Sequence, residues 1–228
     1  KRNFKAIGTH KVIFSGSTAQ TVSFEDPSSN YSQFNILEIS DDAYDVQFST
    51  AISINMLVGE YKFSSTMAVN SVGLPMTEDA TIIGNFTLNG GNLDLAGHTL
   101  TIIGNMTQTG GTININGGKI IVEGNLFQTG GTMNIGGGRL EIEGDYKIQG
   151  SSGGYSNGTL KMTNESDYVY IGGSFLTDSR NSHESCLTAG TMEIKGDFTQ
   201  KSTYNWYNES DKRNFKAIGT HKVIFSGS

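Results

Sequence analysis

Cysteine, proline and charged residues are all scarce in this chain of 228 residues, and each scarcity excludes something. Cys186 is the only cysteine, so no disulfide within the chain stabilises the fold. No run of roughly 18 apolar residues is present, which excludes a membrane-spanning helix. Charged residues make up 17% of the chain and the net charge is −6. Because nucleic acid requires a basic surface, this balance disfavours nucleic acid, and we expect no nucleic-acid partner.

Glycine, by contrast, is abundant, with 30 residues against 2 prolines. Asn, Thr, Ser and Ile are frequent as well, whereas strong helix formers are few. β-Branched residues favour strands, and glycine and asparagine favour the turns between them. The composition therefore predicts an all-β protein made of short strands.

A repeat of twenty residues runs through the middle of the chain without a gap. Its three lines are NFTLNGGNLDLAGHTLTIIG (85–104), NMTQTGGTININGGKIIVEG (105–124) and NLFQTGGTMNIGGGRLEIEG (125–144). Within each line the apolar residues lie two positions apart, which is the period of a β-strand with one face turned inward. Paired glycines such as Gly110–Gly111 separate the strands and suit corners that need positive φ.

This repeat predicts a single-stranded parallel β-helix, or β-solenoid, with one short coil per line. A single coil cannot bury its apolar face, but stacking on the next coil closes the core. The same signature extends more loosely, since Gly59–Lys62 resembles Gly144–Lys147 and further coils close near Ser40, Gly173 and Gly196. We therefore expect residues 1–228 to form one continuous right-handed solenoid with about nine coils of about 20–31 residues per long repeat.

Polar residues also recur at the twenty-residue spacing. In a stacked structure such residues lie over one another and can form amide ladders along the axis. We predict two structural ladders, whose members are Asn85, Asn105, Asn125 and Asp145 in the first, and Gln108 and Gln128 in the second.

The two ends of the chain indicate a much longer repeat. Residues 1–17, KRNFKAIGTHKVIFSGS, are identical to residues 212–228, an offset of 212 − 1 = 211 residues. Residues 1–211 are thus one full unit of a tandem array, and residues 212–228 begin the next unit. An engineered overlap is the alternative. Because terminal coils leave strand edges and apolar interior open, we expect head-to-tail stacking of one molecule on another.

The carboxylates Glu123, Glu141 and Glu143 are the best candidates for catalysis on an outer face. Paired carboxylates at this spacing could serve a polysaccharide-active enzyme of the β-helix type. Lys119 and Arg139 occur beside them, however, and balance their charge. We favour a solvated charged face, and we expect no enzyme activity, no catalytic or metal-binding residues and no cofactor.

Three long coils are the best candidates for recognition, because insertions in a solenoid emerge as loops. They are residues 149–158, 177–187 and 201–214. The last holds the only tryptophan, and its aromatic side chains suit a glycan or a protein ligand on a host surface. The candidate ligand-binding residues are Tyr204, Trp206 and Tyr207.

The coil endings IIGN, VEGN and EIEGD, with QTGGT between them, resemble the repeat arrays of very large bacterial surface or secreted proteins of the adhesin type. The resemblance covers the whole chain and is one of repeat style. It implies an extracellular or cell-surface location and a stiff stalk or fibre, and it transfers no catalytic residues. A carbohydrate- or protein-binding module, a polysaccharide-active enzyme and an intracellular filament remain as alternatives.

Overall fold

The computed structural model describes residues 4–40, 45–57, 59–204 and 212–227. Within these ranges the chain is all-β, and the one short 3-10 turn lies at Lys212–Arg213. No helix in this part of the chain is long and apolar enough to cross a membrane. The predicted all-β class is confirmed.

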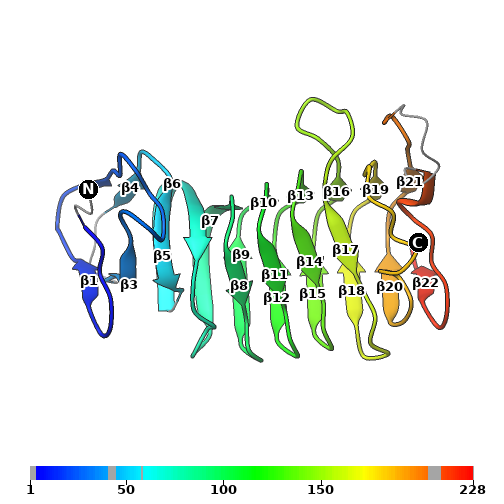
Figure 1. Cartoon of the computed structure of the whole chain (residues 1–228), viewed down its shortest axis with the longest axis horizontal. Helices are drawn as coiled ribbons and strands as arrows, with labels where there is room; N and C mark the ends of the chain where they lie inside the picture. Colours follow the sequence, from blue (N-terminus) through cyan, green and yellow to red (C-terminus); the bar gives the residue numbers. More distant parts are fainter. Residues whose placement is uncertain (1–3, 41–44, 58, 205–211, 228) are drawn as a thin grey trace.

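Most strands belong to one long parallel sheet of 16 strands, which lie side by side along the molecule with β1 and β22 at opposite ends (Figure 1). Its strands are β1 (Lys11–Phe14), β3 (Phe34–Ile39), β5 (Ile52–Met56), β6 (Gly59–Val72), β7 (Ala80–Leu88), β9 (Thr99–Ile103), β10 (Met106–Gln108), β12 (Lys119–Val122), β13 (Leu126–Gln128), β15 (Arg139–Ile142), β16 (Tyr146–Ile148), β18 (Tyr168–Ile171), β19 (Phe175–Thr177), β20 (Thr191–Ile194), β21 (Phe198–Gln200) and β22 (Lys222–Phe225).

Two smaller parallel sheets complete the described strands. The four-stranded sheet contains β8 (Asn92–Asp94), β11 (Thr112–Asn114), β14 (Thr132–Asn134) and β17 (Thr159–Lys161). The two-stranded sheet contains β2 (Gln20–Val22) and β4 (Val46–Phe48). In the central region each twenty-residue line thus supplies three short strands, as predicted, and the long parallel sheet is the arrangement of a β-solenoid.

The register of these strands follows the twenty-residue spacing. Val122 of β12 pairs with Ile102 of β9 on one side and with Ile142 of β15 on the other. All three side chains are fully buried, and they belong to a single apolar core that extends from β2 to β20. In the central coils, residues twenty positions apart therefore lie over one another and share one interior.

Strand β7 explains why two faces of the stack form one sheet. Its first half pairs with β9, where Ile82 faces Ile102, and its second half pairs with β10, where Phe86 faces Met106. Downstream of β7 the two faces are separate strands, divided by a bend at a glycine such as Gly104, whereas β7 continues as one strand through the equivalent Gly84. The long sheet is consequently a pair of parallel ladders that are joined through β7.

The paired glycines lie at corners where the coils are in close contact. Gly111 has φ of +69°, and a Cβ placed on it would lie 2.6 Å from the carbonyl oxygen of Gly91 in the coil below. Gly91 and Gly131 occupy the same corner with φ of +79° and +76°. A side chain at this corner would be strained by the backbone conformation and would also displace the neighbouring coil.

An asparagine ladder runs along the axis, and each rung joins a side chain to the backbone of the next coil. The amide N–H groups of Asn105, Asn125 and Asp145 donate to the Oδ1 atoms of Asn85, Asn105 and Asn125, at 2.9, 2.8 and 2.8 Å. The N–H of Ser174 continues the series by donating to Oδ1 of Asp145 at 2.9 Å. The ladder therefore extends one coil beyond the predicted residues.

Gln108 and Gln128 stack as register partners, but their hydrogen bonds differ from those of an amide ladder. The Nε2 group of Gln108 donates to the carbonyl oxygens of Gly111 and Thr132, at 3.3 and 3.0 Å. Oε1 of Gln128 accepts a hydrogen bond from the hydroxyl of Tyr146 at 2.7 Å. Both glutamines are fully buried, so they satisfy corner carbonyls inside the core instead of each other.

One sequence alignment is wrong. The resemblance between Gly59–Lys62 and Gly144–Lys147 predicts that Tyr61 occupies the column of Tyr146, but Tyr61 pairs with Ile82 on the other ladder. Met67 instead pairs with Phe86 at the head of the Tyr146 column. The physical reason is that β6 passes through both ladders as one strand, without the glycine turn that separates them in the later coils.

The two copies of the repeated segment have the same local conformation. Gly8 and Gly219 have φ of +69° and +66°, and each lies in a turn in which the following histidine N–H bonds back to an isoleucine carbonyl. The Phe4 ring meets the His10 ring at 5.9 Å, and the Phe215 ring meets the His221 ring at 6.4 Å, both edge to face. Strands β1 and β22 are the same four residues, KVIF.

Candidate functional site

The three long loops that the sequence singles out come together on one side of the stack. The ring of Tyr155, from the first loop, lies 4.6 Å from the ring of Tyr204, from the third, at an interplanar angle of 70°. The guanidinium carbon of Arg180, from the second loop, lies 5.2 Å from the centre of the Tyr204 ring. We call these three side chains the tyrosine–arginine cluster.

Hydrogen bonds to Asp178 fix the loops that carry this cluster. The Asp178 side chain is fully buried and accepts two hydrogen bonds from Thr203, one from the backbone N–H at 3.0 Å and one from the hydroxyl at 2.8 Å. The Asp178 carbonyl in turn accepts from the N–H of Ser156 at 2.8 Å. One residue therefore fixes the first and third loops, which brings Tyr155 and Tyr204 into contact.

A second anchor joins the repeated segment to the same loops. Asn214 is 1% exposed, and its Nδ2 group donates to the carbonyls of Ser179 and Lys201 at 3.0 and 2.7 Å. At the surface, Glu184 pairs with Arg213 at 2.8 Å and with Lys216. The hydrogen bond from Lys216 is the main cause that lowers the pKa of the Glu184 carboxyl. Both contacts attach residues 212–216 to the second loop.

His183 is the one histidine buried inside these loops. Its Nε2 atom accepts a hydrogen bond from the N–H of Leu160 at 3.0 Å, which places the ring proton on Nδ1. Burial lowers the pKa of His183 to about 4, because a charged imidazole would lose its hydration. The ring is therefore neutral near pH 7 and acts as a structural hydrogen-bond acceptor.

Of the three predicted ligand-binding residues, Tyr204 lies in the cluster, whereas Trp206 and Tyr207 lie outside the described residues. Sequence reasoning did not identify Tyr155 and Arg180 as partners of Tyr204. Both belong to loops that were predicted for recognition. The sequence therefore indicated the loops, but not which of their side chains contact one another. Loops in consecutive coils project at the same side of a stack, and this juxtaposition could have been anticipated from that rule.

A groove of about 370 Å³ opens beside the first loop. It is lined by Thr107 of β10, by Phe127 of β13 with the following Thr129, and by Lys147 and Gln149. It combines an aromatic ring, hydroxyl groups and one cation, which is a lining that suits a polar ligand such as a sugar. The first loop projects above this part of the sheet in Figure 1.

The carboxylate face has the charge-paired form that the sequence favours. Glu141 pairs with Lys119 at 2.7 Å and with Arg139. Partial burial acts to raise the pKa of Glu141, but the hydrogen bonds from Lys119 and Arg139 outweigh it and lower the pKa below its ordinary value. Glu123 and Glu143 are exposed. A carboxylate held ionised by two cations is poorly suited to act as a general acid near neutral pH.

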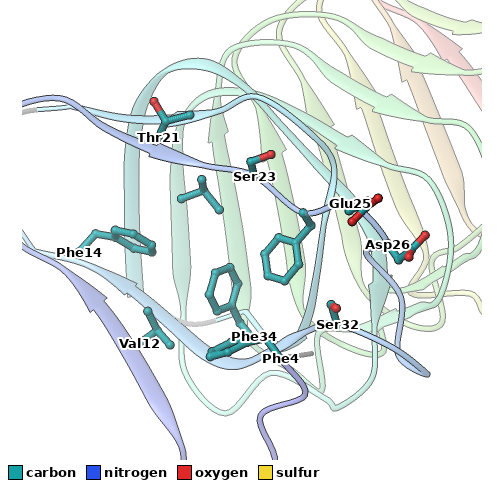
Figure 2. Close-up of a pocket in the computed structure, with 11 residues that line it drawn as sticks. Phe4, Val12, Phe14, Thr21, Ser23, Glu25, Asp26, Ser32 and Phe34 are labelled. Carbon is teal, nitrogen blue, oxygen red and sulfur yellow. The ribbon is translucent and has the colours of Figure 1, made fainter. Parts of the chain in front are cut away.

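A hollow of about 470 Å³ lies at the β1 end of the molecule. The rings of Phe4, Phe14 and Phe34 gather around it in Figure 2. Val12 contributes to the wall, and Glu25 lies at the rim. We call it the end pocket. The sequence did not predict a site here, although it did predict that a terminal coil leaves part of the apolar interior open.

Within the described ranges, no three His, Cys, Asp or Glu residues gather closely enough to hold a metal ion. Comparison of the chain with protein-family models, with curated proteins and with solved structures finds no match. The candidate sites are therefore the tyrosine–arginine cluster with its adjacent groove, and the two ends of the long sheet.

Proposed function

We propose that this chain is a segment of a tandem-repeat β-solenoid that acts as a stiff stalk or fibre. The unit is 211 residues, and the fibre grows by adding units along one axis. Its mechanical strength comes from the continuous parallel ladder and from contacts between neighbouring coils, which add along the array. The number of units then sets the length of the fibre.

The observation that carries this proposal is the agreement between the two copies of the repeated segment. Strands β1 and β22 are identical in sequence and lie at opposite ends of the same sheet (Figure 1). The turn before each strand has the same conformation, as the φ angles of Gly8 and Gly219 show. A segment that folds alike at both ends of a linear sheet is what a repeating fibre requires.

We further propose nine coils per unit, wound in a right-handed sense. Consecutive column partners support most of this count, since Ile194, Ile171 and Ile142 follow one another in adjacent strands. The handedness follows the strong general preference of parallel β-connections. At about 4.8 Å per coil, one unit would lengthen the fibre by about 43 Å.

We also propose that the fibre belongs to an adhesin-like bacterial protein that is secreted or displayed at the cell surface. The support is the repeat style of the coil endings, together with a net charge of −6 and a chain rich in polar, stacked side chains. In this role the fibre would hold other domains at a distance from the cell. The segment itself would require neither catalytic residues nor a cofactor.

The test is the length of a polypeptide that contains two consecutive units. Small-angle X-ray scattering of this polypeptide and of the single chain gives the longest dimension of each. The proposal predicts a rod of unchanged cross-section that is longer by about 43 Å. Two units that fold back beside each other, with a thicker and shorter shape, would contradict it.

The tyrosine–arginine cluster favours a second candidate function, the binding of a glycan or a protein of a host surface. An aromatic ring beside a cation suits sugar stacking and protein contacts, and repetition along a fibre would add avidity. A glycan array and protein capture with the chain and its Tyr204→Ala variant test this idea. Tyr31→Ala, which removes an exposed ring elsewhere, is the matched control. Equal capture by the chain and by Tyr204→Ala would reject the cluster as the site.

A further inference from the structure

The end pocket lies at one end of the long sheet, and the second copy of the repeated segment lies at the other. We propose that a second copy of this chain docks head to tail at the end pocket, with one copy of the repeated segment shared between the two molecules. This proposal rests on the proposed function, which it deepens by naming the partner and the joint. The evidence is that each copy of the segment makes one half of the joint.

The first copy of the segment shows its contacts with the next coil of the stack. Val12 pairs with Leu37 of β3, and the carbonyl of Phe14 accepts a hydrogen bond from the N–H of Ser40 at 2.8 Å. Lys11 forms an ion pair with Glu38 at 2.6 Å. Among the described strands β1 pairs with β3 alone, so its other edge faces outward.

The second copy of the segment shows its contacts with the previous coil of the stack. Val223, the counterpart of Val12, pairs with Met192 of β20, and the N–H of Ser226 donates to the carbonyl of Ile194 at 3.1 Å. The Ser226 hydroxyl donates to the carboxylate of Glu193 at 2.6 Å. Within the described ranges β22 pairs with β20 only.

The two sets of bonds fall on alternate residues of the segment. Towards β3, the carbonyl oxygens of His10 and Phe14 accept from the N–H groups of Ile36 and Ser40. Towards β20, the N–H groups of Lys222 and Ser226, the counterparts of Lys11 and Ser15, donate to the carbonyl oxygens of Gly190 and Ile194. In the described contacts, no atom of the segment that bonds towards β3 is also used in a bond towards β20. One segment can therefore make both sets at once and fix the register of the joint.

The same comparison identifies what fills the end pocket. The pocket is lined by Phe4 and Phe14, and their counterparts at the other end are Phe215 and Phe225. Both counterparts contact one ring, that of Phe198 in β21, at 4.7 Å and 6.2 Å. We therefore assign Phe198 of the preceding molecule to the space beside Phe4 and Phe14, whose rings are drawn in Figure 2.

Aromatic exposure agrees with this assignment. Phe225 is 64% exposed at its end of the sheet, whereas its counterpart Phe14 is covered by the Phe34 ring at 6.3 Å. A shared segment would lie between Phe198 on one side and Phe34 on the other. The joint would thereby bury apolar surface that each isolated end leaves open.

Charge argues for sharing one copy of the segment over stacking both copies. If β22 of one molecule paired in register with β1 of the next, Lys222 would lie directly opposite Lys11, and like charges at that spacing are destabilising. A shared copy places the lysine opposite Ile36, in reach of Glu38, as it is in the first copy. The spare copy is displaced from the joint.

Disulfide trapping tests the joint in a Cys186→Ser background. If the second molecule keeps its first copy of the segment at the joint, Glu193→Cys of the first molecule lies beside Ile13→Cys of the second. If the second copy of the segment from the first molecule takes that place, Ile224→Cys of the first molecule lies beside Glu38→Cys of the second. Each pair would have Cα atoms about 4.8 Å apart, which a disulfide can span. The control mixes Ile13→Cys with Ile103→Cys, an exposed position in the middle of the sheet.

We expect one of the two matched mixtures to give covalent dimers at least about tenfold faster than the control. Cross-linking of both matched mixtures no faster than the control would overturn the joint. To test whether Phe198 occupies the end pocket, Phe198→Ala is added to the productive pair, and it should lower the dimer yield about tenfold. Ile103→Ala, which removes an exposed apolar side chain in the middle of the sheet, should leave the yield unchanged.

Thermal unfolding of Phe198→Ala separates loss of the joint from loss of the fold, and Phe198→Leu provides a milder variant with an intermediate yield. A folded Phe198→Ala protein that cross-links like the parent would overturn the assignment of Phe198. If cross-linking fails while the two-unit polypeptide is still a rod of the expected length, the joint between separate molecules is wrong and the fibre proposal survives.

Discussion

The backbone N–H of Asn125 donates a hydrogen bond to Oδ1 of Asn105 at 2.8 Å, although the two residues are twenty positions apart. The side chain of each residue in this ladder bonds to the backbone of the next coil, so sequence period and structural spacing coincide. Every rung joins neighbouring coils and leaves more distant coils untouched. Stability should therefore depend on single rungs and single corners, each of which can be altered by one substitution.

Removing one rung should destabilise the stack. Asn125→Ala deletes the acceptor for the N–H of Asp145, which is 2.8 Å from it, and leaves that donor half-buried without its partner. We expect the free energy of unfolding to fall by about 1–3 kcal/mol. Urea denaturation measures it, with Lys161→Ala, an exposed position on β17, as the control expected to change stability by less than about 0.5 kcal/mol. Equal stability of the two variants would contradict the ladder.

Two glycines of the same coil separate backbone strain from crowding. Gly111 and Gly117 both have positive φ, but a Cβ on Gly111 would meet the coil below, whereas one on Gly117 would meet nothing within 4 Å. Gly117→Ala should cost about 1–2 kcal/mol for the left-handed conformation alone. Gly111→Ala should cost clearly more, because the neighbouring backbone must also move. Calorimetric unfolding of both variants provides the comparison, and equal losses would reject the close contact between coils.

The buried imidazole of His183 should make stability depend on pH. The folded pKa is about 4 and the ordinary value is 6.5, so between these values the unfolded chain binds a proton that the folded chain does not. Stability from this group is complete above pH 6.5 and is lost as the pH falls towards 4. From about pH 7 to about pH 5 the loss should be about 2 kcal/mol.

The control for this pH effect is His183→Gln, which keeps an acceptor near the N–H of Leu160 but cannot take up a proton. Denaturant unfolding of both proteins at each pH isolates the histidine, because carboxylates whose pKa is lowered, such as Glu141 and Asp145, contribute equally to both. Parallel pH profiles for the two proteins would show that His183 does not titrate in this way.

Loosening Asp178 should release the third loop while the sheet stays intact. Asp178→Ala removes the acceptor of both hydrogen bonds from Thr203. We expect cleavage by trypsin after Lys201 to become about tenfold faster, since local opening requires less free energy. Asp197→Ala, at an exposed carboxylate on the coil that carries Lys201, should cleave at the original rate. An unchanged rate for Asp178→Ala would show that the loop is held by other contacts.

The central coils could be predicted from the sequence because their period is strict. Ile102, Val122 and Ile142 recur without a gap, and a column that is apolar in three coils has no other arrangement that buries it. Tyr61 was misplaced for the opposite reason. The glycine signature around it matched a later coil, but β6 passes through both ladders without a turn, and only pairing with β7 determines its register.

The candidate sites could be predicted only in part. Loop length identified the three loops that meet, but not the contact between Tyr155 and Tyr204, which depends on buried anchors such as Asp178. Gln108 and Gln128 were predicted to form an amide ladder; they do stack, but Gln128 accepts from the hydroxyl of Tyr146. The repeat spacing predicts which column a side chain occupies. It does not predict the hydrogen-bond partners of that side chain, because these depend on which neighbouring polar atoms lack a partner.

The most direct test of the central claim is the distance between spin labels placed in one column, in a Cys186→Ser background. Thr81, Glu193 and Ile224 lie in one outward column, five and six strand spacings apart in the register from β7 to β22. Labels at Thr81 and Glu193 should be about 24 Å apart, and labels at Thr81 and Ile224 about 29 Å apart. Distances that fail to grow by about one strand spacing from the first pair to the second would contradict the stacked coils.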